Sequence, residues 1–484
     1  MTTRADATGA ASTELCAMEA VELGRRYRAG GLSPVEVTKA VLDRIERIDP
    51  DLNAYIEVHA DRARAAARVA EAQLRAGIDL GPLHGVPVSL KDLIRVKGFR
   101  TTGASRALRD APPDREDAGV TERLNAGGAI IFGKVNLREF ALGVPDAGSP
   151  FGNVQNPRRI GYHPGGSSSG SAAAVAAGLG PISLGTDTGG SVRYPANLCG
   201  LVGLKPTNGL VSIRGVIPSS EQLDVVGPLA RSVADAAATL DVIAGYDPDD
   251  PWSLSVAEDR YLPGLERDVR GLRIGVPTNA FYEQGQADAL ALHARARERL
   301  RDLGLTLVPL SLPRPEDVAA IWDRIMSVDM AALHDGWGLD QSLYGRNLRE
   351  RLEVGRKTTA VDYAKAMAER ATLGREWLAV FERIDLLALP GSSAAAAAHD
   401  VETLEVDGRR YPARTLWAPS NRIANLTGFP ALVLPAGATS GGLPIGFQLL
   451  GPPFSEARLL AVGHALESAL GNLIETWGIA PRRG

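Results

Sequence analysis

Between Gly81 and about Gly245, short apolar runs alternate with glycine-rich turns, and this pattern restricts the fold more than any other feature of the chain. The runs include residues 86–90, 129–132, 182–184 and 201–204. Several are separated by segments of helical length, and nearly continuous apolar runs of this size are typical of strands buried on both faces of a sheet. We therefore expect an α/β fold in which helices cover both faces of a mixed central sheet.

Helical patterns flank this region on both sides. Ser33, Pro34 and Glu36 combine an N-cap serine, a proline at the first helical position and a capping-box glutamate. A second helix is expected at 61–76, where Ala and Arg dominate before Gly77. Further along the chain, residues 316–330 and 363–381 predict helices, and residues 431–435 and 446–450 predict strands.

These patterns divide the chain into four parts that together build one domain. The parts are an N-terminal helical segment (1–80), a sheet-forming core (81–305), a helical insertion (306–415) and closing strands with a helix (416–484). We expect the first segment to pack on the core and the last to complete its sheet. The resulting architecture is a single α/β/α domain.

The charge balance argues against binding of nucleic acids. The chain has 484 residues, with 53 Lys and Arg against 57 Asp and Glu, so its formal net charge is −4. Binding of a polyanion needs a surplus of cations, which this chain lacks overall. No run approaches the roughly 18 apolar residues of a membrane span, and the N-terminus lacks the apolar stretch of a leader peptide. We expect a cytoplasmic protein that binds neither nucleic acid nor membrane.

Cysteine and histidine are too scattered to predict a disulfide framework or a metal centre. Cys16 and Cys199 are the two cysteines of the chain, and its seven histidines follow no ligand spacing. We therefore expect no metal and no cofactor, so any chemistry must come from ordinary side chains.

Two segments rich in glycine and serine stand close together and suggest such chemistry. They are 165–171 (Gly-Gly-Ser-Ser-Ser-Gly-Ser) and 185–193 (Gly-Thr-Asp-Thr-Gly-Gly-Ser-Val-Arg). Upstream, Lys91 ends the apolar run 86–90, where burial would depress the pKa of its amine from the usual value of roughly 10.4. A neutral amine beside a serine hydroxyl generates a nucleophile. Each part alone is more often a turn or a solvated charge, and only the combination predicts an active site.

The combination resembles the amidase signature family. That signature runs from paired glycines and a serine, through a helix of small residues, to an acidic residue, glycine, serine, an aliphatic residue, arginine and proline. All of these elements are present between Gly165 and Pro195. Further segments that look like the family's are 90–92, 136–141, 149–153, 203–207, 425–430 and 442–448. The resemblance makes 81–305 an amidase signature core.

The resemblance implies a relay of three side chains. Lys91 would be the base, Ser191 the nucleophile and Ser167 the serine between them, which in the family follows a cis peptide bond. Neutral Lys91 would take a proton from Ser167, which takes one from Ser191, so that the Ser191 hydroxyl attacks a carbonyl carbon and forms an acyl-enzyme. The relay then runs backward and protonates the leaving nitrogen.

The residues before and after the nucleophile are expected to support this chemistry. The backbone N–H groups of Thr188, Gly189 and Gly190 would form an oxyanion hole, since glycine lets the backbone approach the substrate closely. Asp187 and Arg193 would order this loop by hydrogen bonds, because neither has a place in the relay.

The signature motif says less about Ser168, Ser169 and the residues that line the substrate site. We expect Ser168 to support the bridging serine through a hydrogen bond, and the role of Ser169 stays open. Residues expected to line the substrate site are Leu137, Ala141 and Leu142. Residues of the insertion such as Ile321, Trp322, Ile325 and Met326 would either enlarge that site or form the core of a helix.

The predicted substrate is a small amide or carbamate, bound in a broad, apolar pocket to which the 306–415 insertion contributes. The chain is similar overall to bacterial amidases that take aryl amides, nylon-type amides and carbamates, including urethanases. A carbamate needs the same attack and the same oxyanion hole and then loses CO₂, so the catalytic core does not separate the two. Apart from the substrate, the partner that we expect for this hydrolase is a second copy of the chain, in a homodimer.

Two other functions remain as alternatives. Residues 166–170 fit the nucleophile elbow of α/β-hydrolase esterases, with Ser168 as nucleophile and His399 or His464 as base. That elbow needs a strand directly before it, whereas 160–164 reads as a proline-bearing turn.

The second alternative is an amidase subunit that supplies ammonia from glutamine for tRNA-linked amidation, together with partner chains. Asn208 stands where we expect tyrosine in that subgroup, and Leu93 where we expect asparagine. Both departures favour a stand-alone hydrolase.

Overall fold

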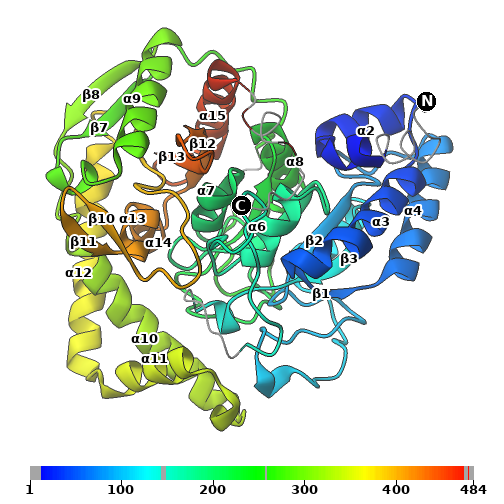
Figure 1. Cartoon of the computed structure of the whole chain (residues 1–484), viewed down its shortest axis with the longest axis horizontal. Coiled ribbons are helices and arrows are strands. Elements are labelled where there is room, and N and C mark those ends of the chain that lie inside the picture. Colours follow the sequence, from blue (N-terminus) through cyan, green and yellow to red (C-terminus); the bar gives the residue numbers. More distant parts are fainter. Residues whose placement is uncertain (1–11, 143–148, 257–258, 472, 474–477, 479–484) are drawn as a thin grey trace.

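A mixed sheet runs through the molecule and contains the strands that the apolar runs predicted (Figure 1). The computed structural model describes residues 12–142, 149–256, 259–471, 473 and 478. Within them, eleven strands form the sheet in the order β1-β3-β2-β4-β6-β5-β12-β13-β9-β7-β8. The strands are Tyr55–Val58 (β1), Pro87–Lys91 (β2), Ile130–Val135 (β3), Ile182–Thr186 (β4), Val202–Lys205 (β5), Val226–Ala230 (β6), Arg273–Pro277 (β7), Thr306–Leu310 (β8), Leu386–Pro390 (β9), Ala431–Ala438 (β12) and Pro444–Leu450 (β13). Thr403–Val406 (β10) and Arg409–Pro412 (β11) form a separate antiparallel pair.

Parallel and antiparallel pairing occur in the same sheet, which confirms the predicted mixed architecture. β2 is parallel to both of its neighbours, β3 and β4, and β7 is parallel to β8 and β9. The other neighbouring strands are antiparallel. Every residue of β2 to β6 is buried, which is why these strands read as continuous apolar runs and not as alternating patterns.

Helices cover both faces of the sheet and complete the predicted α/β domain (Figure 1). They are Ala20–Arg28 (α2), Pro34–Leu52 (α3), Ala60–Arg75 (α4), Gly119–Ala126 (α5), Ser169–Ala176 (α6), Arg193–Cys199 (α7), Val233–Ile243 (α8), Ala287–Asp302 (α9), Val318–Gly336 (α10), Arg346–Lys357 (α11), Ala360–Val380 (α12), Ala413–Trp417 (α13), Asn421–Thr427 (α14) and Glu456–Leu470 (α15). In the described part of the chain, no helix has the length and apolarity needed to cross a membrane.

The N-terminal helices form where their sequence signals predict them. The Ser33 hydroxyl accepts from the Val35 N–H at 3.0 Å, and the Ser33 N–H donates to Glu36 at 2.9 Å, so the capping box is complete. α4 matches the helix expected at 61–76. Residues 1–11, part of the N-terminus in which the sequence predicts no leader peptide, lie outside the described residues.

The segment 306–415 is joined to the sheet at two places. It begins with β8 and contains β9, which pairs with β13 and β7. Between these strands, α10, α11 and α12 match the predicted helical stretch and enclose a second apolar core that includes Ile321, Trp322, Ile325 and Met326. The segment is therefore not purely helical, since it also contains the strands β8 to β11; α10 and α11 extend away from the sheet in Figure 1.

Candidate active site

Lys91 is the last residue of β2 and is completely buried. Its Nζ donates to Ser167 Oγ at 2.7 Å and to Thr186 Oγ1 at 2.7 Å. β2 and β4 are parallel neighbours, so Lys91 and Thr186 meet at the same edge of the sheet. Burial lowers the pKa of Lys91 to about 7, although the carboxylates of Asp224 and Asp187 raise it. A large share of this amine is therefore neutral near pH 7.

Ser167 lies on the loop that leads into α6, and the Gly166–Ser167 peptide bond is cis. The loop is held on both sides: the Arg138 N–H donates to the Ser167 carbonyl at 3.1 Å, and the Ser168 N–H donates to the Ser191 carbonyl at 3.3 Å. The structure thus brings Lys91 and Ser167 into hydrogen-bond contact and joins the backbone of Ser191 to the same loop. Ser191 Oγ has no hydrogen bond to another described residue.

Ser191 can be reached from solvent. Along residues 181–200, from β4 to the end of α7, Gly189 and Ser191 are partly exposed and the other residues are buried. The opening in this otherwise buried segment therefore coincides with the predicted nucleophile.

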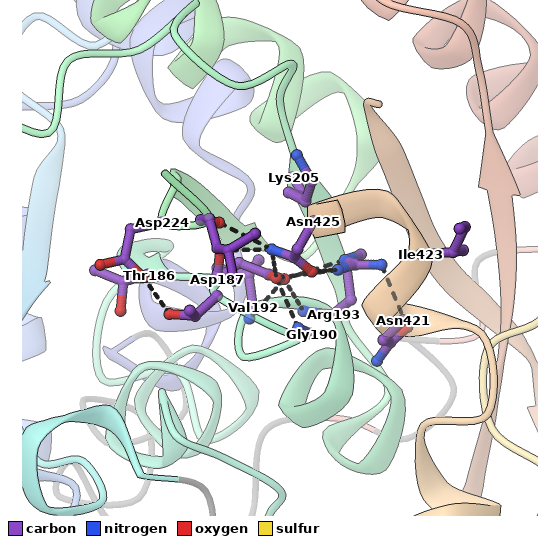
Figure 2. Close-up of polar contacts among 12 residues, drawn as sticks. Thr186, Asp187, Gly190, Val192, Arg193, Lys205, Asp224, Asn421, Ile423 and Asn425 are labelled. Carbon is purple, nitrogen blue, oxygen red and sulfur yellow. Dashed lines mark hydrogen bonds and ion pairs between the residues drawn. The ribbon is translucent and has the colours of Figure 1, made fainter. Parts of the chain in front are cut away.

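Asp187 and Arg193 form a buried ion pair directly behind the loop that carries Ser191 (Figure 2). Arg193 donates through Nε and Nη2 to the two carboxylate oxygens at 3.1 and 3.0 Å. Asp187 also accepts from the N–H groups of Gly190 at 2.7 Å and Val192 at 3.1 Å. Burial alone would raise the pKa of Asp187, but the charge and hydrogen bonds of Arg193 hold that pKa well below its usual value. The pair orders the loop, which agrees with the supporting role predicted for both residues.

Gly190 departs from the role predicted for it. Its N–H already donates to Asp187, a charged acceptor, so it is not available to an oxyanion in this structure. The N–H groups of Thr188, Gly189 and Ser191 have no acceptor among the described residues. Gly190 is still needed as glycine, because its φ is +117° and a Cβ there would lie 2.6 Å from Asn421.

A family model described as Amidase matches residues 36–460 of the chain. The chain belongs to the amidase family. The A subunit of the glutamyl-tRNA(Gln) amidotransferase of Geobacter metallireducens is 38% identical over 473 residues, which cover 93% of this chain and 96% of that protein. The corresponding protein of Chloroflexus aurantiacus is 39% identical, with 94% and 97% covered.

Solved structures place this amidase among enzymes of the same fold. The peptide amidase of Stenotrophomonas maltophilia is 31% identical with a TM-score of 0.81, and 96% of this chain and 98% of that one are covered. A bacterial aryl acylamidase of the amidase signature family is 26% identical with a TM-score of 0.86 over the same shares. A third solved structure is described as a vestigial protein complex that reveals the evolutionary origins of an s-triazine catabolic enzyme. Its chain is 33% identical with a TM-score of 0.88, and 93% of this chain and 98% of that one are covered.

Four residues that were given no catalytic role in the sequence contact the site of this amidase. Thr186 shares the Lys91 amine, and Asp224 accepts from the hydroxyl of Thr188. Asn425 donates to the Asp187 carbonyl at 2.8 Å, and Trp322 Nε1 donates to the Thr188 carbonyl at 2.8 Å. Burial raises the pKa of Asp224 to about 6. The sequence places Asn425 in a segment that resembles the family and makes Trp322 a candidate for the substrate site, but neither pattern indicates these hydrogen bonds.

The remaining predicted residues are buried around the site. The Ser168 hydroxyl donates to the Thr186 carbonyl at 3.2 Å and so does not support Ser167 directly. Ser169 Oγ is buried without a partner in the described part of the chain. Leu137 and Ala141 pack together in a small apolar cluster, whereas Leu142 belongs to the core formed by the 306–415 helices. Their contribution to substrate binding stays a prediction.

The geometry does not favour Ser168 as a nucleophile. The residue is completely buried, its hydroxyl is already engaged, and no strand stands directly before it among residues 157–167. The nucleophile elbow of an α/β-hydrolase requires the opposite arrangement.

Proposed function

We propose that this amidase hydrolyses C–N bonds of small amides and carbamates through a relay from Ser191 by way of Ser167 to Lys91. The observation that carries the proposal is the 2.7 Å hydrogen bond between a fully buried lysine amine and Ser167 Oγ. A lysine whose pKa has fallen to about 7 is half neutral at that pH and can accept a proton. The partly exposed Ser191 is the hydroxyl in this segment that a substrate can reach.

The reaction proceeds through an acyl-enzyme. Ser191 Oγ forms a bond to the carbonyl carbon while its proton passes through Ser167 to Lys91. The negative oxygen of the tetrahedral intermediate is stabilised by the N–H groups of Thr188, Gly189 and Ser191, and each such donor is worth on the order of 10²–10³ in rate. The C–N bond then breaks as the proton returns to the nitrogen, and water releases the acid. A carbamate gives a carbonic half-ester that loses CO₂.

A second candidate function is that of the amidase component of a glutamine-dependent amidotransferase. It is supported by the two relatives named as A subunits of glutamyl-tRNA(Gln) amidotransferase, which are 38% and 39% identical over nearly the whole chain. In that role the substrate would be glutamine, and partner chains would use the ammonia. The predicted homodimer and cytoplasmic location belong to the first proposal.

A substrate panel separates the two candidates. The purified chain is given an aryl amide, an aryl carbamate, an aryl ester and glutamine, with Ser191→Ala as the blank. Turnover of the amide and carbamate without partner chains supports the hydrolase. Release of ammonia from glutamine alone, with no turnover of the other three, supports the amidotransferase component instead.

We expect a fluorophosphonate to label Ser191. Its hydroxyl displaces fluoride from phosphorus, and peptide mass spectrometry should find one adduct per chain on the peptide that contains residue 191. Labelling should be lost in Ser191→Ala and slowed in Lys91→Ala. Ser168→Ala is the matched control and should be labelled normally. An adduct that disappears with Ser168 would support the esterase alternative.

The rate should depend on pH through the Lys91 amine. Only the neutral amine accepts a proton, and its pKa is about 7, so kcat/KM should rise about tenfold per pH unit below 7 and level off above it. Lys205 is the control, because burial also lowers its pKa to about 7 but its amine donates to Pro206 and Asn208. Lys205→Met should keep the profile. A profile that is flat from pH 5 to 8 would contradict Lys91 as the base.

A further inference from the structure

Two arginine side chains, from α11 and α14, lie beside a single carboxylate on α10, and the charge of a third arginine, Arg414 on α13, also acts on this carboxylate. Arg351 Nη1 lies 3.1 Å from Asp323 Oδ1, and Arg422 Nη2 lies 3.9 Å from the same oxygen. Burial and, to a smaller extent, the charge of Arg414 lower the pKa of Arg422 to about 10. One aspartate thus faces three guanidinium groups, and positive charge is in excess.

Two of these guanidinium groups have donors that no acceptor engages in the part of the chain that the structure describes. Arg422 has no hydrogen bond to a described residue, and its ion pair with Asp323 is long. Arg414 has no hydrogen bond or ion pair within the described residues. A guanidinium carries five N–H donors, and donors that no acceptor of the protein engages can bind a ligand. The side chain of Arg422 is 23% exposed, so a ligand can still reach it.

The Trp322 side chain lies between Arg422 and the loop that carries Ser191. The Arg422 guanidinium carbon is 4.6 Å from the centre of the Trp322 ring. The same indole donates to the Thr188 carbonyl, and a Cβ on Gly189 would lie 2.5 Å from its Cζ2. A ligand that contacts Arg422 and follows the indole therefore arrives at the loop that carries Ser191.

A second unpaired donor lies beside the same loop. Asn421, the residue before Arg422, is completely buried, and its Oδ1 accepts from Arg193 at 3.5 Å (Figure 2). Its Nδ2 has no partner in the described part of the chain, and it borders Gly190. Buried amide N–H groups are normally paired, so this donor is a second, independent indication of an acceptor that a ligand supplies.

We propose that Arg422 and Arg414 form an anion subsite that binds a carboxylate of the substrate, so that this amidase acts on anionic amides. The proposal rests on the C–N hydrolysis proposed above and names its substrate class. A planar guanidinium fork matches a carboxylate by paired hydrogen bonds, which adds geometric selectivity to charge attraction. The apolar pocket expected from the sequence is thereby replaced, on this side, by a charged one.

Matched substrate pairs test the subsite. For a carboxylate on the acyl side, N-succinyl-4-nitroanilide is compared with N-(4-methylpentanoyl)-4-nitroanilide; for one on the amine side, 4-acetamidobenzoate is compared with 4′-methylacetanilide. In the wild type, kcat/KM should favour the carboxylate member of at least one pair by about tenfold or more. Arg422→Gln and Arg414→Gln should remove this preference through KM, and should leave the neutral member within about twofold.

Two further variants separate recognition from general charge effects. Arg422→Lys keeps the charge without the fork and should retain part of the preference. Arg324→Gln is the matched control, because Arg324 lies on α10 like Trp322 but pairs with Glu369 at 3.8 Å and is 50% exposed; it should change nothing. An Arg422→Gln variant that slows both members of a pair equally would overturn the proposal.

A binding measurement keeps the subsite distinct from catalysis. Calorimetry on Ser191→Ala should show tighter binding of the carboxylate member, and this difference should vanish in Ser191→Ala combined with Arg422→Gln. If the wild type hydrolyses none of the compounds but this difference is present, the proposed hydrolysis fails while the subsite stands. Equal binding of both members in both pairs would overturn the subsite, whatever the rates.

Discussion

Lys91→Ala is expected to lose amide hydrolysis almost entirely, with kcat lower by on the order of 10³–10⁴. In the proposed relay, the variant removes the base that takes the Ser191 proton and the acid that returns a proton to the leaving nitrogen. Its amine is fully buried and 2.7 Å from Ser167 Oγ, so water has no equivalent position from which to replace it. Initial rates on an aryl amide, measured above pH 8 where the wild type is fully active, give the comparison.

An aryl ester separates the two roles of the lysine. An aryloxide leaves without prior protonation, so ester hydrolysis needs the base only for the attack. We expect the loss on an ester to be at least about tenfold smaller than the loss on the amide with the same acyl group. Lys205→Met, which also removes a buried amine, should lower both rates equally and only slightly. Full amidase activity in Lys91→Ala would end the proposed relay.

Most of the proposed catalytic residues can be picked out in the sequence, because their signals are local. Lys91 closes an apolar run, and the end of a buried strand fixes both the position and the burial of its amine. Ser167 and Ser191 lie in short glycine-rich segments whose residue order matches a known signature. The strands β2 to β5 were equally visible, since a strand buried on both faces must be apolar along most of its length.

The contacts that order the site could not be predicted, because they join residues far apart in the chain. Trp322 donates to the Thr188 carbonyl across 134 residues, and Asn425 reaches Asp187 across 238. No periodicity or spacing records such pairs. The engagement of the Gly190 N–H has a related cause: the acceptor of this N–H is the Asp187 carboxylate, whose position the local motif does not indicate.

Missed strands have a different physical reason. β7 and β8 lie at the edge of the sheet, and both contain partly exposed residues, so their sequences are not uniformly apolar. β9 is buried, but it follows the long helix α12 after a short turn, inside the segment 306–415 that the sequence predicts to be helical. The arginine group behind Trp322 was missed because its members come from separate helices.

Asp187→Asn is expected to be the most destabilising single change in the site, lowering the free energy of unfolding by about 3–5 kcal/mol. The carboxylate and Arg193 are both completely buried. Asparagine keeps the shape but cannot accept from Arg193 at both positions, which leaves a buried guanidinium uncompensated. The midpoint of urea unfolding, followed by circular dichroism, measures the loss. Asp268→Asn is the matched control, since its pair with Arg270 is exposed, and it should leave the midpoint of unfolding unchanged.

A double variant distinguishes charge balance from order in the catalytic loop. Asp187→Asn combined with Arg193→Met removes both members of the pair, so no uncompensated charge remains and part of the lost stability should return. Activity should stay low, because the N–H groups of Gly190 and Val192 have lost their charged acceptor and the loop that carries Ser191 is no longer held. Recovery of activity together with stability would show that the loop keeps its geometry without Asp187, and that the carboxylate serves the fold alone.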